Sequence, residues 1–80
     1  MHFEQYKNTG FLLKGLREDN DLKQENIAHI LNTSQTVYSR YERDERALPI
    51  KHLKTLCHFY GVSADYLLGL VDEPLPYKRK

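Results

Sequence analysis

A chain of 80 residues is long enough for one small domain and too short for several, because a short chain buries a small share of its surface. Its apolar and charged fractions, 40% and 29%, are those of an ordinary globular domain, and no apolar run reaches the roughly 20 residues of a membrane-spanning helix. The formal net charge of +1 gives no indication of nucleic-acid binding, which depends largely on Lys and Arg side chains that displace counterions.

Residues 1–9 contain no apolar stretch followed by a small-residue cleavage site, so we expect no secretory signal. Cys57 is the single cysteine, which rules out an intramolecular disulfide and a cysteine-rich zinc site. Both features favour a reducing compartment, and we expect a cytoplasmic protein.

The first predicted helix begins near Thr9, a candidate N-cap, and ends in the polar stretch 18–21. Leu13 and Leu16 give this helix an apolar edge. The residues before it, 1–8, are predicted to be an N-terminal extension of the domain.

A short second helix is predicted over residues 24–31, where Ile27, Ala28 and Leu31 repeat at the spacing of one helical face. Asn32 follows at once, and Asn is frequent where a chain takes a left-handed conformation to leave a helix. The pattern therefore predicts a tight turn directly after this helix.

A third helix is predicted over residues 34–43, with Ser34 as its N-cap. At the helical period its apolar side chains fall on one side. These are Val37, Tyr38 and Tyr41. The opposite arc carries hydrogen-bonding side chains, namely Gln35, Thr36, Ser39, Arg40 and Arg43, and Glu42 lies at the boundary.

A fourth helix is predicted over residues 50–60, with Pro49 near its first turn and Gly61 just after its end. Its apolar stripe consists of Ile50, Leu53, Leu56, Cys57 and Tyr60. Ser63 is a candidate N-cap for a last short helix that is closed by Gly69.

The segment 71–80 contains two prolines and is predicted to be an extended tail after a domain of residues 9–70. No stretch of the sequence shows the sustained alternation of Val, Ile and Thr that indicates a strand. Four or five helices without strands make the predicted fold class all-α.

The polar arc of the third helix is the feature that indicates function. The major groove of DNA accepts one α-helix, and its base edges are read by side chains such as Gln, Arg, Ser and Thr. Two short helices joined by a tight turn, the second with such a face, form a helix-turn-helix. The candidate base-reading residues are Gln35, Thr36, Ser39 and Arg40. A polar face is more often merely solvated, so this pattern alone is weak.

Several motifs in the expected order strengthen the hypothesis. They are LKQENIA at 22–28, NTS at 32–34, VYSRYE at 37–42 and YGVSADYLLG at 60–69. With this combination the chain resembles the Cro/C1-type (Xre) helix-turn-helix family of phage and bacterial repressors over most of residues 11–70. The resemblance implies a compact five-helix bundle of the lambda-repressor type that binds duplex DNA.

The resemblance also implies roles for individual residues. Gln24 would contact a DNA phosphate from the start of the second helix, where the alternative is a solvated polar side chain. Arg17 and Glu42 would form a partly buried ion pair between the first and third helices, where the alternative is two unrelated surface charges. The full set expected to contact phosphates is Lys23, Gln24, Thr33, Ser34, Arg43 and Arg46.

Some positions depart from the family pattern. Lys23 stands where a Ser or Thr N-cap is usual, which forfeits on the order of 1 kcal/mol of capping. Asp44 stands where the family loop often has Gly, and with Glu45 it dilutes the positive charge of Arg43 and Arg46. We therefore expect modest phosphate affinity with a steep dependence on salt.

The remaining reactive side chains are expected to have structural roles. His29, His52 and His58 show no metal-ligand spacing, so we expect no metal and no cofactor. Cys57 is expected to pack as a small hydrophobe, the alternative being a redox sensor. The sequence shows no catalytic constellation and no small-molecule site, which predicts that the protein is not an enzyme.

The leading hypothesis is a transcriptional regulator, a repressor or a switch of a mobile element, that binds a palindromic operator as a homodimer. Leu70, Val71, Leu75 and Tyr77 are expected to form the subunit contact or, alternatively, to cover the domain's own core. The competing hypothesis, favoured by the low net charge and the apolar tail, is a protein-interaction module such as an antitoxin or adaptor that retains the fold.

Overall fold

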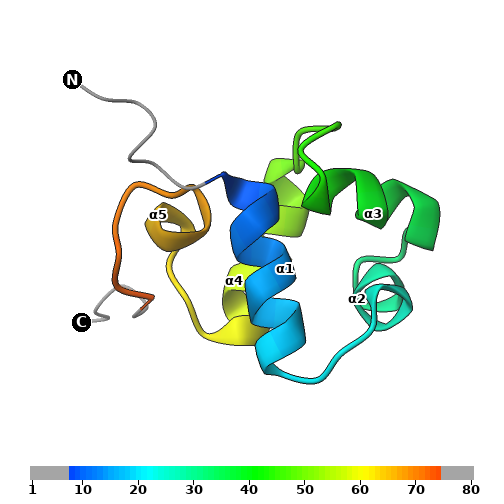
Figure 1. Ribbon diagram of the computed structural model, residues 1–80, viewed down its shortest axis with the longest axis horizontal. Helices are drawn as coiled ribbons and strands as arrows, with labels where there is room; N and C mark the ends of the chain where they lie inside the picture. Colours follow the sequence, from blue (N-terminus) through cyan, green and yellow to red (C-terminus); the bar gives the residue numbers. More distant parts are fainter. Residues whose placement is uncertain (1–7, 75–80) are drawn as a thin grey trace.

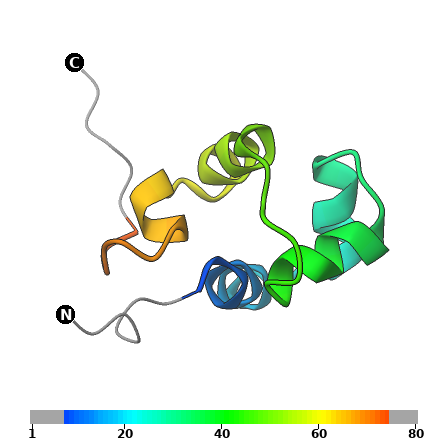
Figure 2. The same ribbon diagram turned by 90° about the horizontal axis from the view of Figure 1, so that it is seen from above.

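A computed structural model describes residues 8–74, which form five helices without a strand. The helices are α1 (Thr9–Asp19), α2 (Gln24–Ile30), α3 (Gln35–Glu42), α4 (Ile50–Tyr60) and α5 (Ala64–Leu67). α2 and α3 lie at one end of the molecule and α5 lies at the opposite end, with α1 and α4 between them (Figures 1 and 2). The all-α prediction and the five-helix bundle are confirmed.

The turn between α2 and α3 forms as the sequence predicts. Asn32 adopts a left-handed conformation with φ of 56°, and Thr33 N donates a 2.9 Å hydrogen bond to the Ala28 carbonyl. Ser34 then caps α3, because its Oγ accepts from Val37 N at 3.1 Å. The chain thus leaves one short helix and enters the next within a few residues.

α1 begins one position earlier than predicted. Its N-cap is Asn8, so Thr9 is the first helical residue and the assignment of Thr9 as the cap is wrong. The Asn8 side chain makes no capping hydrogen bond. A donor of the first turn, Gly10 N, instead bonds to the Asp44 carboxylate at 3.1 Å, a residue 34 positions away that local capping rules do not consider.

α4 has the predicted bounds, but its buried face differs from the predicted stripe. Ile50 is 72% exposed, whereas His52, absent from the prediction, is 8% exposed. Ile50 is the first residue of the helix and so lies at its uncovered end, while the His52 ring packs edge-on against Tyr41 with centroids 6.1 Å apart. The stripe therefore includes His52 and excludes Ile50.

The ends of α4 and α5 follow the predicted chemistry. Gly61 ends α4 with a left-handed φ of 68°, and Ser63 Oγ caps α5 by accepting from Tyr66 N at 3.1 Å. Ser63 N also donates to the Pro74 carbonyl at 3.2 Å, so the segment after α5 returns to the start of that helix. Residues 1–7 of the predicted extension and 75–80 of the predicted tail lie outside the described residues.

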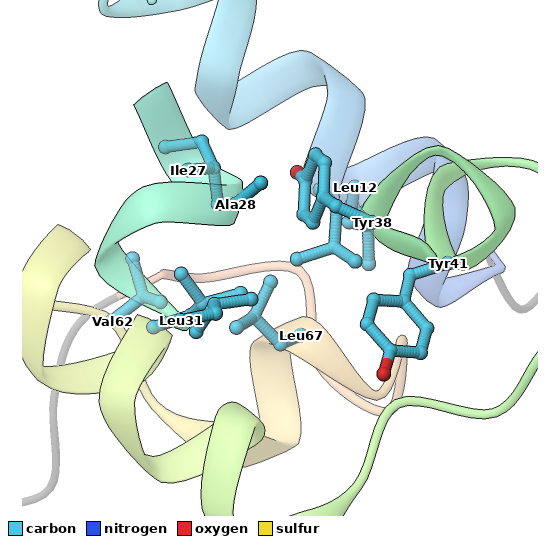
Figure 3. Close-up of a cluster of buried hydrophobic side chains, with 10 residues drawn as sticks. Leu12, Ile27, Ala28, Leu31, Tyr38, Tyr41, Val62 and Leu67 are labelled. Carbon is cyan, nitrogen blue, oxygen red and sulfur yellow. The ribbon is translucent and has the colours of Figure 1, made fainter. Parts of the chain in front are cut away.

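Every helix contributes one fully buried side chain to a common core. These side chains are Leu13, Ile27, Tyr38, Leu56 and Leu67. Figure 3 shows the core side chains of α1, α2, α3 and α5 converging, together with Leu31 and Val62 from the adjoining turns. A single core of this kind fixes the position of α3 relative to the rest of the protein.

Candidate nucleic-acid interface

The exposed side of α3 and the start of α2 together form a shallow polar hollow of about 370 Å³. Its lining consists of Gln24, Gln35, Thr36, Ser39 and Arg43, none of which is acidic. Three of the four candidate base-reading residues and two of the candidate phosphate-contacting residues are thus brought to one surface. Amide, hydroxyl and guanidinium groups at this surface can donate hydrogen bonds to base edges and to phosphate oxygens.

The other predicted residues are placed around this hollow or away from it. Arg40 is exposed on α3 but does not line the hollow, and Lys23 is exposed at the N-cap of α2. Thr33 is partly buried, and Ser34 uses its hydroxyl to cap α3. Arg46 lines a different hollow, of about 380 Å³, together with side chains of α1 and α4.

Arg43 has a competing partner within the protein. Its guanidinium lies 3.4 Å from the Glu45 carboxylate, and both side chains are about half exposed. An exposed pair of this kind contributes little to stability and is weakened by salt. Its significance is electrostatic, because a neighbouring carboxylate lowers the attraction of Arg43 for a polyanion.

A buried carboxylate joins three helices and bonds to Gln24, a residue of the polar hollow. Glu42 of α3, with a side chain 3% exposed, accepts from Arg17 Nε of α1 at 2.7 Å and from Arg17 Nη2 at 3.1 Å. The same Glu42 Oε1 accepts from Gln24 Nε2 of α2 at 3.0 Å. Arg17 Nη1 also donates to the Leu22 carbonyl at 2.9 Å, which holds the guanidinium in place. The structure therefore places Arg17, Glu42 and Gln24 in one hydrogen-bonded group.

The charges of this group stabilise one another. Burial alone would raise the pKa of the Glu42 carboxyl, but the hydrogen bonds from Arg17 and its other neighbours outweigh burial and lower that pKa. The hydrogen bond to Glu42 in turn raises the pKa of Arg17. Beside them lie two buried hydroxyls, that of Tyr38, which is close enough to Glu42 to help lower its pKa, and that of Tyr60, whose pKa burial raises to about 12.

The structure shows how Asp44, which departs from the family pattern, is accommodated in the loop after α3. It adopts a left-handed φ of 56°, the conformation for which glycine is usual, and its Oδ1 accepts from Gly10 N at 3.1 Å. Gly10 is required for this approach, since a Cβ at residue 10 would overlap the Glu42 carbonyl and lie 2.7 Å from Asp44 Oδ2. The aspartate thus connects the loop after α3 to the start of α1, a role that the sequence analysis did not assign.

The second departure, Lys23, is partly compensated. An ammonium group cannot accept a hydrogen bond, so Lys23 caps no amide of α2 with its side chain. Asn26 supplies the reverse half of a capping box, because its Oδ1 accepts from Lys23 N at 2.8 Å. The start of α2, which carries Gln24, is therefore ordered without a Ser or Thr cap.

His52 gives the fold a sensitivity to acid. Burial, with a smaller effect of the Lys51 charge, lowers the pKa of His52 below its ordinary value of 6.5. The unfolded chain therefore binds a proton at His52 more readily than the folded chain does. The contribution of neutral His52 to the free energy of unfolding is complete above pH 6.5 and declines as the pH falls below it.

We expect the temperature at the midpoint of thermal unfolding to decrease from pH 7 to pH 5, and to decrease less in the variant His52→Gln. Equal pH profiles for the two proteins would contradict this assignment.

Further features of residues 8–74 bear on a metal site, a reactive cysteine and a membrane-spanning helix. Within residues 8–74 there is no group of three His, Cys, Asp or Glu side chains placed to hold a metal ion. Burial raises the pKa of the Cys57 thiol, which opposes formation of a reactive thiolate. None of the helices in this range is long and apolar enough to cross a membrane.

Comparisons with known proteins agree on one family, that of the helix-turn-helix proteins. A family model described as Helix-turn-helix matches residues 13–67, and this confirms the resemblance to Cro/C1-type regulators. The "uncharacterized HTH-type transcriptional regulator YobD" of Bacillus subtilis (strain 168) is 36% identical over 64 residues. The match covers 80% of this chain but 57% of that protein.

Two solved structures share the fold. A transcriptional regulator from Listeria innocua matches with a TM-score of 0.77 and 29% identity, over 82% of this chain and 62% of that one. The P22 c2 repressor, solved in complex with synthetic operator 9T, matches with a TM-score of 0.74 over 81% of this chain and 98% of that one. At 23% identity the second likeness shows the fold alone. The chain spans less than two thirds of the length of YobD and of the Listeria protein.

Proposed function

The chain belongs to the helix-turn-helix family, and from this premise we propose that it binds double-stranded DNA sequence-specifically and acts as a transcriptional repressor. The observation that carries the proposal is the polar hollow, which joins the start of α2 to the exposed side of α3 and contains no acidic side chain. In this proposal α3 enters the major groove, whose width accepts one helix.

The proposed base contacts come from four side chains of α3. Gln35 can bond in a bidentate manner to adenine, and Arg40 to guanine, while the hydroxyls of Thr36 and Ser39 accept or donate to several base edges. Gln35, Thr36 and Ser39 line the hollow, and Arg40 is exposed on the same short helix. These are the groups that would distinguish one operator sequence from another.

The proposed phosphate contacts lie at both ends of the motif. Lys23, Gln24, Thr33 and Ser34 precede or begin the two helices, and Arg43 follows α3. Such contacts position the protein on the duplex without reading sequence. Arg46 lines the second hollow, so Arg43 is the better candidate of the two arginines.

The proposed assembly is a homodimer on a palindromic operator. A two-fold symmetric pair would place one α3 in each of two major grooves about one helical turn apart. The segment after α5 lies at the end of the molecule opposite α2 and α3 (Figure 1), and its exposed apolar residues Leu70 and Val71 suit a subunit contact. The other residues assigned to that contact, Leu75 and Tyr77, lie outside the described residues.

The test of the proposal is selection of bound sequences from a random duplex pool at about physiological salt, followed by titration of the enriched duplex against a scrambled one. Enrichment of a palindrome with half-sites about 10 base pairs apart would support a dimeric sequence reader. Weak binding without enrichment would contradict it.

The same exposed apolar residues support a second candidate function, a module whose main partner is another protein. The two functions differ in their response to salt. DNA binding should weaken by orders of magnitude as the salt concentration rises, whereas an apolar protein interface should change little. A stoichiometric protein partner, without DNA bound at low salt, would favour the second function.

Glu45 is expected to restrain DNA affinity by pairing with Arg43. Glu45→Gln removes the carboxylate 3.4 Å from the guanidinium, so we expect the Kd for duplex DNA to fall about two- to fivefold at low salt and to approach the wild-type value at high salt. Glu73→Gln, at an exposed residue after α5, changes the net charge equally and serves as the control. Equal effects of the two substitutions would assign the change to net charge alone.

A further inference from the structure

We propose that Glu42 is a positioning residue for DNA binding, which fixes the Gln24 side chain in its phosphate-binding orientation before the duplex arrives. This inference rests on the proposed function, because it concerns how one proposed phosphate contact is prepared. The proposed role goes beyond the ion pair of Glu42 with Arg17, since it depends on the hydrogen bond that Glu42 accepts from the Gln24 amide.

The geometry gives Gln24 one fixed and one free donor. Its Nε2 donates to Glu42 Oε1 at 3.0 Å, and a side-chain amide carries two N–H groups. Gln24 is partly buried and lines the polar hollow, so its second N–H is the donor available to a phosphate oxygen. Glu42 therefore determines where that donor lies.

Glu42 is itself prevented from moving. Two nitrogens of Arg17 donate to its two carboxylate oxygens, and a third nitrogen of Arg17 is bonded to the Leu22 carbonyl. The Glu42 side chain is almost fully buried, so its oxygens are withdrawn from bulk water and its hydrogen bonds are strengthened. A continuous chain of hydrogen bonds thus holds the Gln24 side chain in place, from the Leu22 carbonyl between α1 and α2 through Arg17 to Glu42.

The consequence for binding is preorganisation. A glutamine on a helix surface samples many rotamers, and a ligand that bonds to it must first restrict them. With Glu42 in place this restriction has already occurred in the free protein. Glu42→Gln leaves a single carbonyl oxygen, for which the cationic Arg17 is the stronger donor, so the bond to Gln24 is the one expected to be lost.

The test is a double-mutant cycle on the Kd for the selected duplex, using Glu42→Gln, Gln24→Ala and the double variant at a temperature where circular dichroism shows each to be folded. Glu42→Gln should raise the Kd about three- to tenfold more in the wild-type background than in the Gln24→Ala background, the effect expected for releasing one ordered side chain. The added positive charge is common to both backgrounds and cancels. Equal changes in the two backgrounds would overturn the inference.

A control and a second variant keep the test decisive. Tyr38→Phe removes a buried hydroxyl beside Glu42 that makes no hydrogen bond to Gln24, so it should change the Kd equally in both backgrounds. If Glu42→Gln does not fold, Glu42→Asp keeps the charge but is too short to reach Arg17 and Gln24 together. The same coupling is expected for it, and its absence would count against the inference.

A measurement without DNA separates this inference from the proposed function. In the free protein, NMR should show one Gln24 side-chain amide proton that is protected from exchange by its bond to Glu42 and a second that exchanges readily, whereas in Glu42→Gln both should exchange readily and in Tyr38→Phe the wild-type pattern should remain. Ready exchange of both protons in the wild-type protein would overturn the positioning role. A protected proton in a protein that enriches no duplex would instead overturn the proposed DNA binding.

Discussion

Gly10→Ala is expected to destabilise the protein by about 1–3 kcal/mol, whereas Gly15→Ala, on the same helix, is expected to stabilise it by about 0.5–1 kcal/mol. A methyl group at residue 10 would overlap the Glu42 carbonyl and approach Asp44, and a backbone carbonyl cannot rotate aside as a flexible side chain can. At residue 15 a methyl group meets no atom within 4 Å, so alanine only improves the helix propensity of α1.

Denaturant unfolding followed by circular dichroism measures both effects directly. Asp44→Asn tests a different contribution, that of the Asp44 charge, because it keeps the oxygen that accepts from Gly10 N while removing the negative charge. It should cost less than Gly10→Ala. Stabilisation by alanine at both glycines would show that α1 does not approach the loop after α3 as closely as the structure places it.

Arg40→Ala is expected to raise the Kd for the selected operator about 10- to 100-fold, the effect of losing one bidentate contact to a base. Arg40→Lys keeps the positive charge but loses the planar fork of the guanidinium, so it should relax the base preference at one position while preserving the salt dependence. Both effects are read by titrating the operator and its single-base variants at fixed salt.

The control for Arg40 is Lys54→Ala, which removes one positive charge from an exposed residue of α4. It should weaken binding to the operator and to a scrambled duplex alike, and only slightly. If Arg40→Ala behaved as Lys54→Ala does, Arg40 would contribute charge but no base recognition, and the assignment of α3 as the reading helix would be wrong in this respect.

The sequence predicted those parts of the fold that depend on neighbours in the chain. Ser34 and Ser63 cap the helices that follow them, and Asn32 and Gly61 take the left-handed conformations that end the preceding helices. In each case the donor and acceptor lie within a few residues of each other, so local chemistry determines the outcome.

The parts that the sequence did not predict depend on contacts between distant residues. Gly10 and Asp44 are 34 positions apart, and Gln24 and Glu42 are 18 apart. No periodicity or capping rule connects such pairs, because their proximity follows from how α1, α2 and α3 pack. The same reason explains why His52 was missed and Ile50 was misplaced, since the burial of a residue near a helix end depends on which side chain from another helix covers it.

The contribution of one fully buried side chain from each helix also determines how the protein loses its structure. No helix can detach without exposing its own buried side chain to water and leaving a void in the core that it shares with the other four. The described domain is therefore expected to unfold as a single cooperative unit. A substitution at Leu67 of α5, the helix opposite α2 and α3 (Figure 1), would therefore reduce the number of folded molecules without altering the surface that each of them presents. In a cell, the amount of active protein would be sensitive to positions that never approach the proposed ligand.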